Sequence, residues 1–302
     1  MKRKILKTNL FFRLLVYLIF VTTVSGNGLY QMIYLPRDSR SLSMNQGGSA
    51  YNYIYLQKNP ATLEQNQSNL GFHLINFPQS INSLQIDYSK KLLKGVFASQ
   101  ICILDYGNFQ DKKNNYEFSA QDILLSSAFK KSIIGMFSFG ISGSYYSSNI
   151  ENYYSNLLLF NIGIKTQINR YRFGLGISVE NLSYIFNQYT HITEKIPTLF
   201  RLSTFYKPEH LPVNINLDLY NNSENYIISI EFYPNKNILF RFGASSERKY
   251  LMTGNFQNDF FSGLSGGLSF KYKKNEIQAA LKNLGSSGII TSLTLSYNID
   301  DF

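Results

Sequence analysis

Apolar and polar residues alternate along most of the chain after about residue 70. In the stretch 171–182, the odd-numbered residues from Tyr171 to Val179 are apolar, whereas the even-numbered residues from Arg172 to Glu180 are polar or small. Side chains on a strand alternate between its two faces, so this stretch predicts a strand with one apolar face. That face runs for about nine residues, which is the length that a tilted strand needs to cross a bilayer. A strand of a soluble sandwich is typically about 5–6 residues long.

The same period of two predicts fourteen strands between residues 70 and 299. Their ranges are Leu70–Phe77, Ser83–Ser89, Gly95–Leu104, Ala120–Phe129, Ile133–Tyr146, Asn156–Ile168, Tyr171–Leu182, Leu199–Tyr206, Val213–Tyr220, Tyr226–Tyr233, Ile238–Ala244, Gly263–Tyr272, Glu276–Leu284 and Ile289–Ile299. A soluble β protein is the competing interpretation, but an open sheet of this size would leave long unpaired edges. An even number of strands is typical of closed bacterial barrels, so we expect an all-β fold, a transmembrane antiparallel β-barrel.

The connections between these strands differ in length. Asn169-Arg170 and Lys273–Asn275 are short, whereas Asp105–Ser119, Ser183–Thr198 and Ser245–Ser262 are long. Outer-membrane barrels have short periplasmic turns and longer extracellular loops. The long connections are therefore the predicted extracellular loops.

The N-terminal residues lack the strand pattern. Residues 1–26 contain five basic residues, an apolar core at Leu14–Val21, and Val24 and Gly26 at the −3 and −1 positions of a cleavage site. This arrangement predicts a signal peptide for export through the Sec pathway, with an uncleaved anchor as the alternative. Residues 27–69 contain the turn signal Asn59-Pro60-Ala61 and predict a plug or hatch segment, followed by the barrel at 70–302.

Composition supports this division. The chain has 24 Phe and 23 Tyr, with 44% hydrophobic residues, and its mature part has no apolar run long enough for a helical membrane span. Half of the net charge of +10 lies in residues 1–26, and the rest is dispersed, which argues against nucleic-acid binding and leaves anionic lipid as a partner of the basic loops. Cys102 is the single cysteine, so we expect an inert thiol that is packed or faces the membrane.

Candidate chemistry is sparse. The three histidines lack metal-ligand spacing, and Gly174 and Gly176 lie inside a strand, where they indicate a bend or a close approach of the plug. We therefore predict no catalytic, cofactor-binding or metal-binding residues. Charges on the polar strand faces predict a salt-bridge network in the lumen, with a permeation or ligand path as the alternative. These candidates are Arg172, Glu180, Arg201, Asp218, Glu231 and Arg241.

Several short motifs carry a family resemblance. The element Asn59-Pro60-Ala61 resembles the one that opens FadL-type barrels, and Asp105–Phe109, Glu117–Asp122, Val179–Leu182, Lys195–Pro197 and Lys282–Gly285 resemble the PorV/PorQ branch of that superfamily. Leu35–Leu42 is similar to the segment that begins this branch after its signal peptide. The order and spacing of the motifs match PorQ-like proteins better than PorV-like ones. The chain departs from the family at Ser41–Asn45, where an Ala-rich run is usual.

The resemblance implies a fourteen-stranded outer-membrane barrel of the type IX secretion system of Bacteroidetes. Such a barrel is not an enzyme, and it acts as a membrane platform for the surface complex that attaches cargo to lipopolysaccharide. The implied partners are outer-membrane lipid and lipopolysaccharide, a PorZ-like protein and a PorU-like sortase. The alternative is a FadL-like transporter of hydrophobic small molecules, which would need an apolar pocket behind the plug. A hydrolase would need an acid, a base and a nucleophile at one rim.

Overall fold

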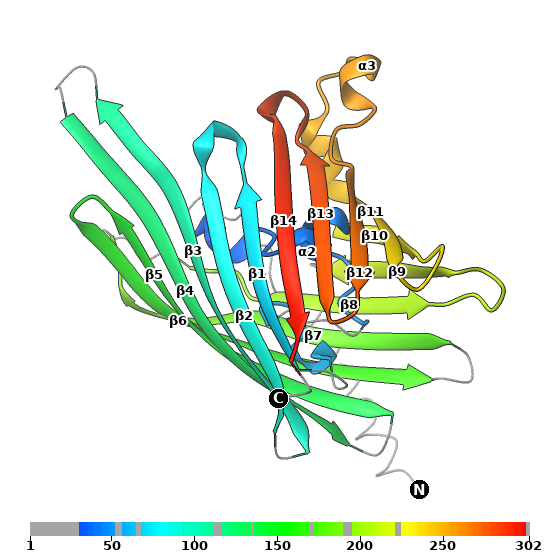
Figure 1. Ribbon diagram of the computed structural model, residues 1–302. Coiled ribbons are helices and arrows are strands. Elements are labelled where there is room, and N and C mark those ends of the chain that lie inside the picture. Colours follow the sequence, from blue (N-terminus) through cyan, green and yellow to red (C-terminus); the bar gives the residue numbers. More distant parts are fainter. Residues whose placement is uncertain are drawn as a thin grey trace, which may run out of the picture.

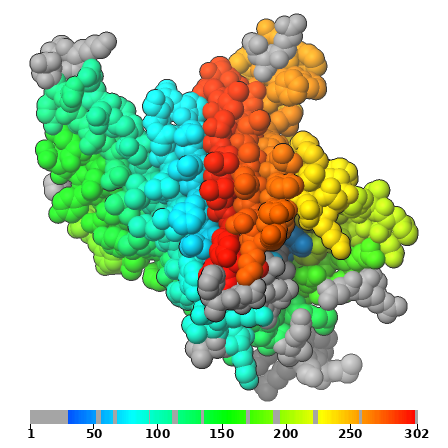
Figure 2. All heavy atoms as spheres, viewed as in Figure 1, coloured from blue at the N-terminus to red at the C-terminus, as the bar shows by residue number. Residues whose placement is uncertain are grey.

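The chain forms a closed antiparallel barrel in which each strand pairs with its sequence neighbours and β14 closes onto β1. A computed structural model describes residues 30–51, 56–64, 68–92, 94–111, 116–133, 136–168, 172–189, 195–220 and 225–299. Figure 1 shows the strands around the blue N-terminal residues, and Figure 2 shows β14 in red beside β1 and β2 in cyan. The predicted fold class is confirmed, whereas the predicted signal peptide lies outside the described residues.

Fourteen strands are present in the described residues, close to the predicted positions. They are β1 (Asn69–Asn76), β2 (Asn82–Leu92), β3 (Gly95–Asp111), β4 (Tyr116–Ile133), β5 (Phe137–Ile150), β6 (Tyr153–Ile168), β7 (Phe173–Asn187), β8 (Leu199–Tyr206), β9 (Val213–Tyr220), β10 (Asn225–Phe232), β11 (Ile238–Ser245), β12 (Ser265–Tyr272), β13 (Asn275–Asn283) and β14 (Ile289–Asn298).

The two faces of the wall follow the predicted alternation. In β7, Ile177 is 56% exposed on the outer face, whereas Ser178 and Glu180 are buried on the inner face. Leu202, Phe242 and many other outward-facing apolar side chains are also exposed. An apolar outer surface around a polar interior is the arrangement of a membrane-spanning barrel.

The wall is much taller on one side. Strands β3 to β7 have 14–18 residues, whereas β8 to β12 have 8 each. The prediction of loops at Asp105–Ser119 and at the start of Ser183–Thr198 was therefore wrong, because β3, β4 and β7 continue through most of them. Stacked aromatic rings hold the extension of the β3–β4 pair, with 5.1 Å between the ring centroids of Phe109 and Phe118.

A β-bulge interrupts β7 at Asn181. This residue has a φ of 62°, and the register between β6 and β7 shifts between Phe160 and Ile162. Glu180 and Asn181 are consequently both buried, and Leu182 returns to the outer face. The extra residue preserves the apolar outer face above the bulge, where Tyr184 and Phe186 are exposed.

The described helices are short. They are the 3-10 helices η1 (Gln31–Tyr34), η2 (Pro60–Thr62), η3 (Pro78–Ser80), η5 (Ser246–Leu251) and η6 (Gly285–Ser287), and the α-helices α2 (Ser39–Ser43) and α3 (Phe256–Asp259). Helices η1, α2 and η2 belong to the N-terminal residues inside the barrel, while η5 and α3 lie in the β11–β12 loop. No helix in the described ranges has the length and apolarity needed to span a membrane.

Candidate functional site: the plugged lumen

The described part of the predicted plug lies in the lumen and is tied to the wall by hydrogen bonds. Helix α2 begins at Ser39, and the side chain of the preceding Asp38 caps it by accepting from the backbone N–H of Ser41 at 2.7 Å. The helix carries mostly polar residues yet is fully buried, because the wall supplies its partners. The backbone N–H of Ser39 donates to Thr294 Oγ1 at 3.1 Å, and Ser39 Oγ donates to the carbonyl oxygen of Gln278 at 3.2 Å.

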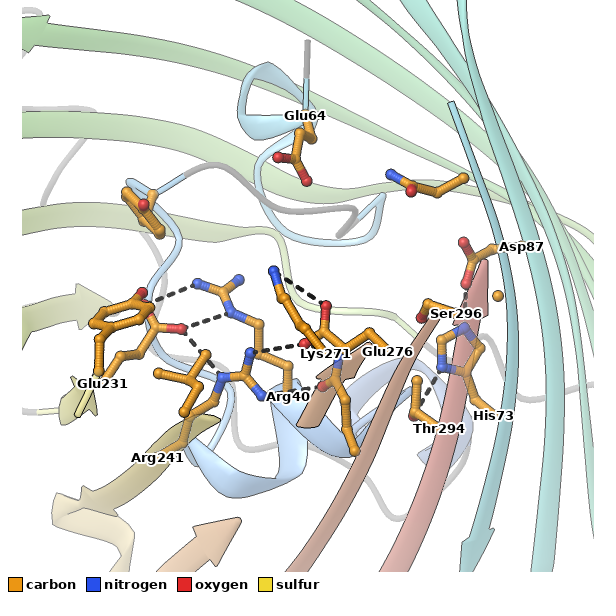
Figure 3. A pocket seen from close by; sticks show the side chains of 16 residues that line it. Arg40, Glu64, His73, Asp87, Glu231, Arg241, Lys271, Glu276, Thr294 and Ser296 are labelled. Carbon is orange, nitrogen blue, oxygen red and sulfur yellow. Dashed lines mark hydrogen bonds and ion pairs between the residues drawn. The ribbon is translucent and has the colours of Figure 1, made fainter. Parts of the chain in front are cut away.

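The first ion-pair cluster joins α2 to β10 and β11. Arg40 Nε lies 3.1 Å from Glu231 Oε1, and Arg241 Nε lies 3.2 Å from the same oxygen. Arg241 also donates to Ser269 Oγ at 2.6 Å. Figure 3 shows Arg40 and Arg241 converging on Glu231 from the plug and from the wall. All three charged groups are buried, so the pairing offsets the cost of removing them from bulk water.

The second cluster joins the plug to β7, β8 and β9. Arg201 Nε lies 2.8 Å from Glu180 Oε1, and Lys58 Nζ of the plug lies 3.8 Å from Glu180 Oε2. The carboxylate of Asp218 accepts from the backbone N–H groups of Gly48 and Ser49 at 2.7 and 3.1 Å. The structure thus brings the predicted lumen charges Glu180, Arg201 and Asp218 together and adds plug groups to them.

Arg172 lies elsewhere. Its φ of 51° is left-handed, its side chain is 46% exposed, and it pairs with Glu209 in the β8–β9 turn at 3.3 Å. The prediction of a lumen-facing Arg172 is therefore corrected. Strand β7 begins only at Phe173, so the alternation that placed Arg172 on the inner face does not extend to it.

The motif Asn59-Pro60-Ala61 fits a glycine-lined part of the wall. Asn59 caps η2 by accepting from the N–H of Ala61 at 3.1 Å, and its amide donates to the carbonyl oxygen of Ser49 at 3.1 Å. A Cβ at Gly176 would lie 2.9 Å from Asn59 Nδ2, so this glycine allows the close approach of the plug that the sequence predicted. Gly140 and Gly163 make the same room on β5 and β6: a Cβ on Gly140 would overlap Pro60 and Ala61, and one on Gly163 would overlap Asn59.

An apolar cluster fills the lumen on the tall side of the barrel. Met32 and Ile33 of η1 pack there against wall residues that include Leu104, Leu124 and Leu157. Cys102 belongs to this cluster and is a buried, packed thiol, with its Sγ 3.4 Å from Ser83 Oγ. The alternation of the strands does not predict this cluster. Its one signal is the run Leu157–Phe160, where both faces of the strand are apolar.

Two clusters of polar side chains, around Asp122 and around His73, were also not predicted from the sequence. Asp122 accepts from the hydroxyls of Tyr106 and Tyr146 at 2.7 and 2.6 Å inside the tall half of the lumen. His73 pairs with Asp87 on the neighbouring strand, and its Nδ1 lies 3.0 Å from Thr294 Oγ1. These pairs come from different strands, and only the register of the wall brings them together.

The His73 cluster connects to the plug. Thr294 is 1% exposed, and its hydroxyl oxygen accepts from the backbone N–H of Ser39. The hydroxyl of Thr294, the imidazole of His73 and the carboxylate of Asp87 therefore form a series of contacts that links α2 to β14, β1 and β2. Among the described residues, no group of three His, Cys, Asp or Glu side chains is placed to hold a metal ion.

A polar pocket of about 230 Å³ remains between the plug and the wall at the end that carries the short turns. Figure 3 shows its charged lining, which includes Arg40, Glu231, Arg241, Glu276 and His73. A cavity of this kind is suited to bound water, because its walls offer many hydrogen-bonding groups.

Comparisons with known proteins agree on the fold. The sequence matches no protein-family model and no curated protein. Similar solved structures include the toluene transporter TbuX of Ralstonia pickettii, with 10% identity over 88% of this chain and 100% of that chain and a TM-score of 0.59. The toluene transporter TodX of Pseudomonas putida has 11% identity over 85% of this chain and 96% of that chain, with a TM-score of 0.57. The likeness concerns the fold alone: it supports the FadL-type barrel and leaves the PorV/PorQ resemblance a prediction.

Proposed function

We propose that this protein is a non-catalytic membrane platform for a surface-attachment complex of type IX secretion. The observation that carries the proposal is the plug in the lumen, whose Arg40 and Lys58 form buried ion pairs with Glu231 and Glu180 of the wall. A platform needs a rigid barrel and does not need a path through it. The sequence resemblance to PorQ-like proteins supplies the implied partners, a PorZ-like protein and a PorU-like sortase, and the implied site of work, the outer membrane.

The loops and strand extensions at the end opposite the short turns are the proposed contact surfaces. In the β11–β12 loop, Tyr250 is 73% exposed and Phe256 is 77% exposed. Exposed aromatic side chains on a scaffolded loop are frequent anchors of protein interfaces. The extended β3–β4 hairpin adds Phe109 and Tyr116, which are 41% and 44% exposed.

The second candidate is a transporter of hydrophobic small molecules, and the fold comparisons favour this candidate over the platform. The two similar structures described above, TbuX and TodX, are of toluene transporters. The apolar cluster around Met32 and Leu124 also offers an apolar lining, provided that Tyr30–Leu35 moves away from it. Against this candidate stands the polar, charged character of the pocket on the other side of the plug.

A deletion strain separates the two candidates. The platform predicts that cargo proteins are secreted but remain unattached at the surface, while uptake of a monoaromatic hydrocarbon stays normal. Complementation with the wild-type chain should restore attachment, and so should an Arg172→Gln variant, because Arg172 lies outside the lumen. Normal cargo attachment together with reduced hydrocarbon uptake would overturn the platform and support the transporter.

A further inference from the structure

The two ends of the barrel differ in charge. At the end with the short turns, the described residues present a set of exposed lysines, here called the basic rim, which consists of Lys90, Lys91, Lys94, Lys131, Lys236 and Lys273. The acids in the described part of these turns are Glu209 and Glu276, and they already pair with Arg172 and Lys271. The rim therefore carries surplus positive charge.

The opposite end has the reverse balance. Its described residues include Asp105, Glu117, Glu151, Glu247 and Asp259, against the cations Lys195, Arg248 and Lys249. Among the described residues, the surplus positive charge thus lies at one end of the barrel. Short turns mark the periplasmic end of outer-membrane barrels, so the basic rim faces the periplasmic leaflet.

Two lysines of the rim point outward, toward lipid. Lys90 has the same strand parity as the outward-facing Leu92, and Lys131 has the same parity as Ile133, which is 50% exposed. Across β3, Lys90 is opposite Phe97 and Lys131 is opposite Gly95. The two lysines therefore flank one strand on the outer face, two strand spacings and two residues of register apart, which is about 12 Å.

This position corresponds to the edge of the hydrocarbon layer. Phe97 and Phe129 lie in the same outer-face row as Lys90, and the next row holds Tyr88, Ser99 and Ser127. The row above that is fully apolar, with Ile86, Ile101 and Leu125. Lysine side chains at such a boundary extend along the apolar surface and place the ammonium group among lipid headgroups. In the turn after β12, Lys273 Nζ similarly lies 5.4 Å from the ring centroid of the exposed Tyr272.

We propose that the basic rim, with Lys90 and Lys131 as its outward pair, binds the phosphate groups of anionic phospholipids in the periplasmic leaflet. If the rim instead bound an acidic periplasmic protein, its lysines should lie at the tips of neighbouring turns on one side of the barrel. The rim lysines instead lie on several separate turns around the barrel, and Lys90 and Lys131 face sideways into the membrane. The proposal is independent of whether the barrel is a platform or a transporter.

Native mass spectrometry of the full chain tests the proposal, with phosphatidylglycerol and phosphatidylcholine offered in equal amounts. The wild-type chain should retain phosphatidylglycerol preferentially, and Lys90→Gln with Lys131→Gln should reduce that preference about threefold or more, because each lysine near an anionic surface adds attraction. Lys90→Arg with Lys131→Arg should keep it. A matched control at the opposite end, Lys195→Gln with Lys249→Gln, should leave it unchanged.

Heat-modifiable migration in detergent establishes that each variant is folded before its lipids are measured. An equal loss of phosphatidylglycerol in the control variant would overturn the proposal, and so would an unchanged preference in the Lys90 and Lys131 variant. Preferential retention of lipid A over phosphatidylglycerol by the rim would also contradict it, because lipid A belongs to the outer leaflet. A rim that captures an acidic periplasmic protein and ignores phosphatidylglycerol would contradict it as well.

Discussion

Glu231 forms ion pairs with Arg40 of the plug and with Arg241 of the wall, so one carboxylate joins the plug to the wall. Alternation alone placed Glu231 and Arg241 on the inner face, and the structure pairs them across β10 and β11. The contribution of Arg40 was not predictable, because it comes from a helix nearly two hundred residues earlier in the chain. The same parity argument failed for Arg172, whose left-handed backbone lies just outside the strand.

Replacing Glu231 by Gln should destabilise the barrel by about 3 kcal/mol, because the buried guanidinium groups of Arg40 and Arg241 lose the carboxylate that they share, and Arg241 keeps only Glu276 at 3.8 Å among the described carboxylates. The free energy of unfolding in urea, measured in lipid vesicles, gives the value. Glu209→Gln breaks an exposed pair and serves as the control, with an expected change within about 1 kcal/mol. Equal effects of the two substitutions would show that Glu231 does not lie in a buried ion pair.

Replacing Gly163 by Ala should loosen the plug, because the added Cβ would overlap the side chain of Asn59. We expect a cost of about 1–3 kcal/mol and faster proteolysis of the N-terminal residues. Gly143→Ala is the matched control on the outer face, where a Cβ would meet the Phe160 ring at an ordinary 3.5 Å. Identical proteolysis of both variants would argue against a plug seated on this wall.

Strand positions were the most predictable elements. Leu199–Tyr206 and Val213–Tyr220 have the predicted bounds, because their alternation is uninterrupted. The tall strands were underestimated, since the extension of β3 beyond Asp105 includes Gly107 with a φ of 78° and a shift in register. Irregular positions of this kind break the sequence pattern while the sheet continues through them.

The β3–β4 extension should depend on its aromatic pairs. Phe118→Ser removes the stack with Phe109 and should increase amide hydrogen exchange at residues 108–111 by roughly three- to tenfold, as expected for the loss of about 0.5–1.5 kcal/mol. Exchange in the membrane-spanning part of β3 should not change. Loss of protection along the whole strand would mean that the extension and the barrel unfold as one unit.

The β11–β12 loop should open in acid. The backbone N–H of Thr253, its hydroxyl and the N–H of Gly254 hydrogen-bond Asp259 and hold the pKa of its carboxyl below the usual value. A lowered pKa in the folded loop means that the carboxylate stabilises it above the usual pKa of about 3.9, and that this stabilisation is lost as the pH falls through the lowered value.

A tryptophan reporter can follow this opening, since the chain contains no natural Trp. Phe261→Trp should show a change in emission as the pH falls from 6 to 2. The additional substitution Asp259→Asn should remove the pH dependence. A transition that persists in the Asp259→Asn background would assign it to another group.

At the scale of the whole molecule, the described residues form a barrel with an apolar outside and a plug in its lumen, and their charges differ in balance between the two ends. The closed barrel and the presence of a plug followed from strand number and from the loss of alternation before residue 70. The filling of the lumen could not be predicted, because it depends on contacts such as those of Asn59 with β6 and of Asp218 with Gly48. These contacts join segments more than a hundred residues apart, and no local pattern encodes them.

Conductance in a planar lipid bilayer tests the closed lumen most directly. We predict that the wild-type chain inserts without steady ionic current, whereas a chain lacking residues 30–64 conducts, because the described plug residues occupy the lumen and pair with the wall. The amount of inserted protein is measured in both cases, so that an absence of current is not mistaken for a lack of insertion. Stable open-channel currents from the wild-type chain would contradict the account.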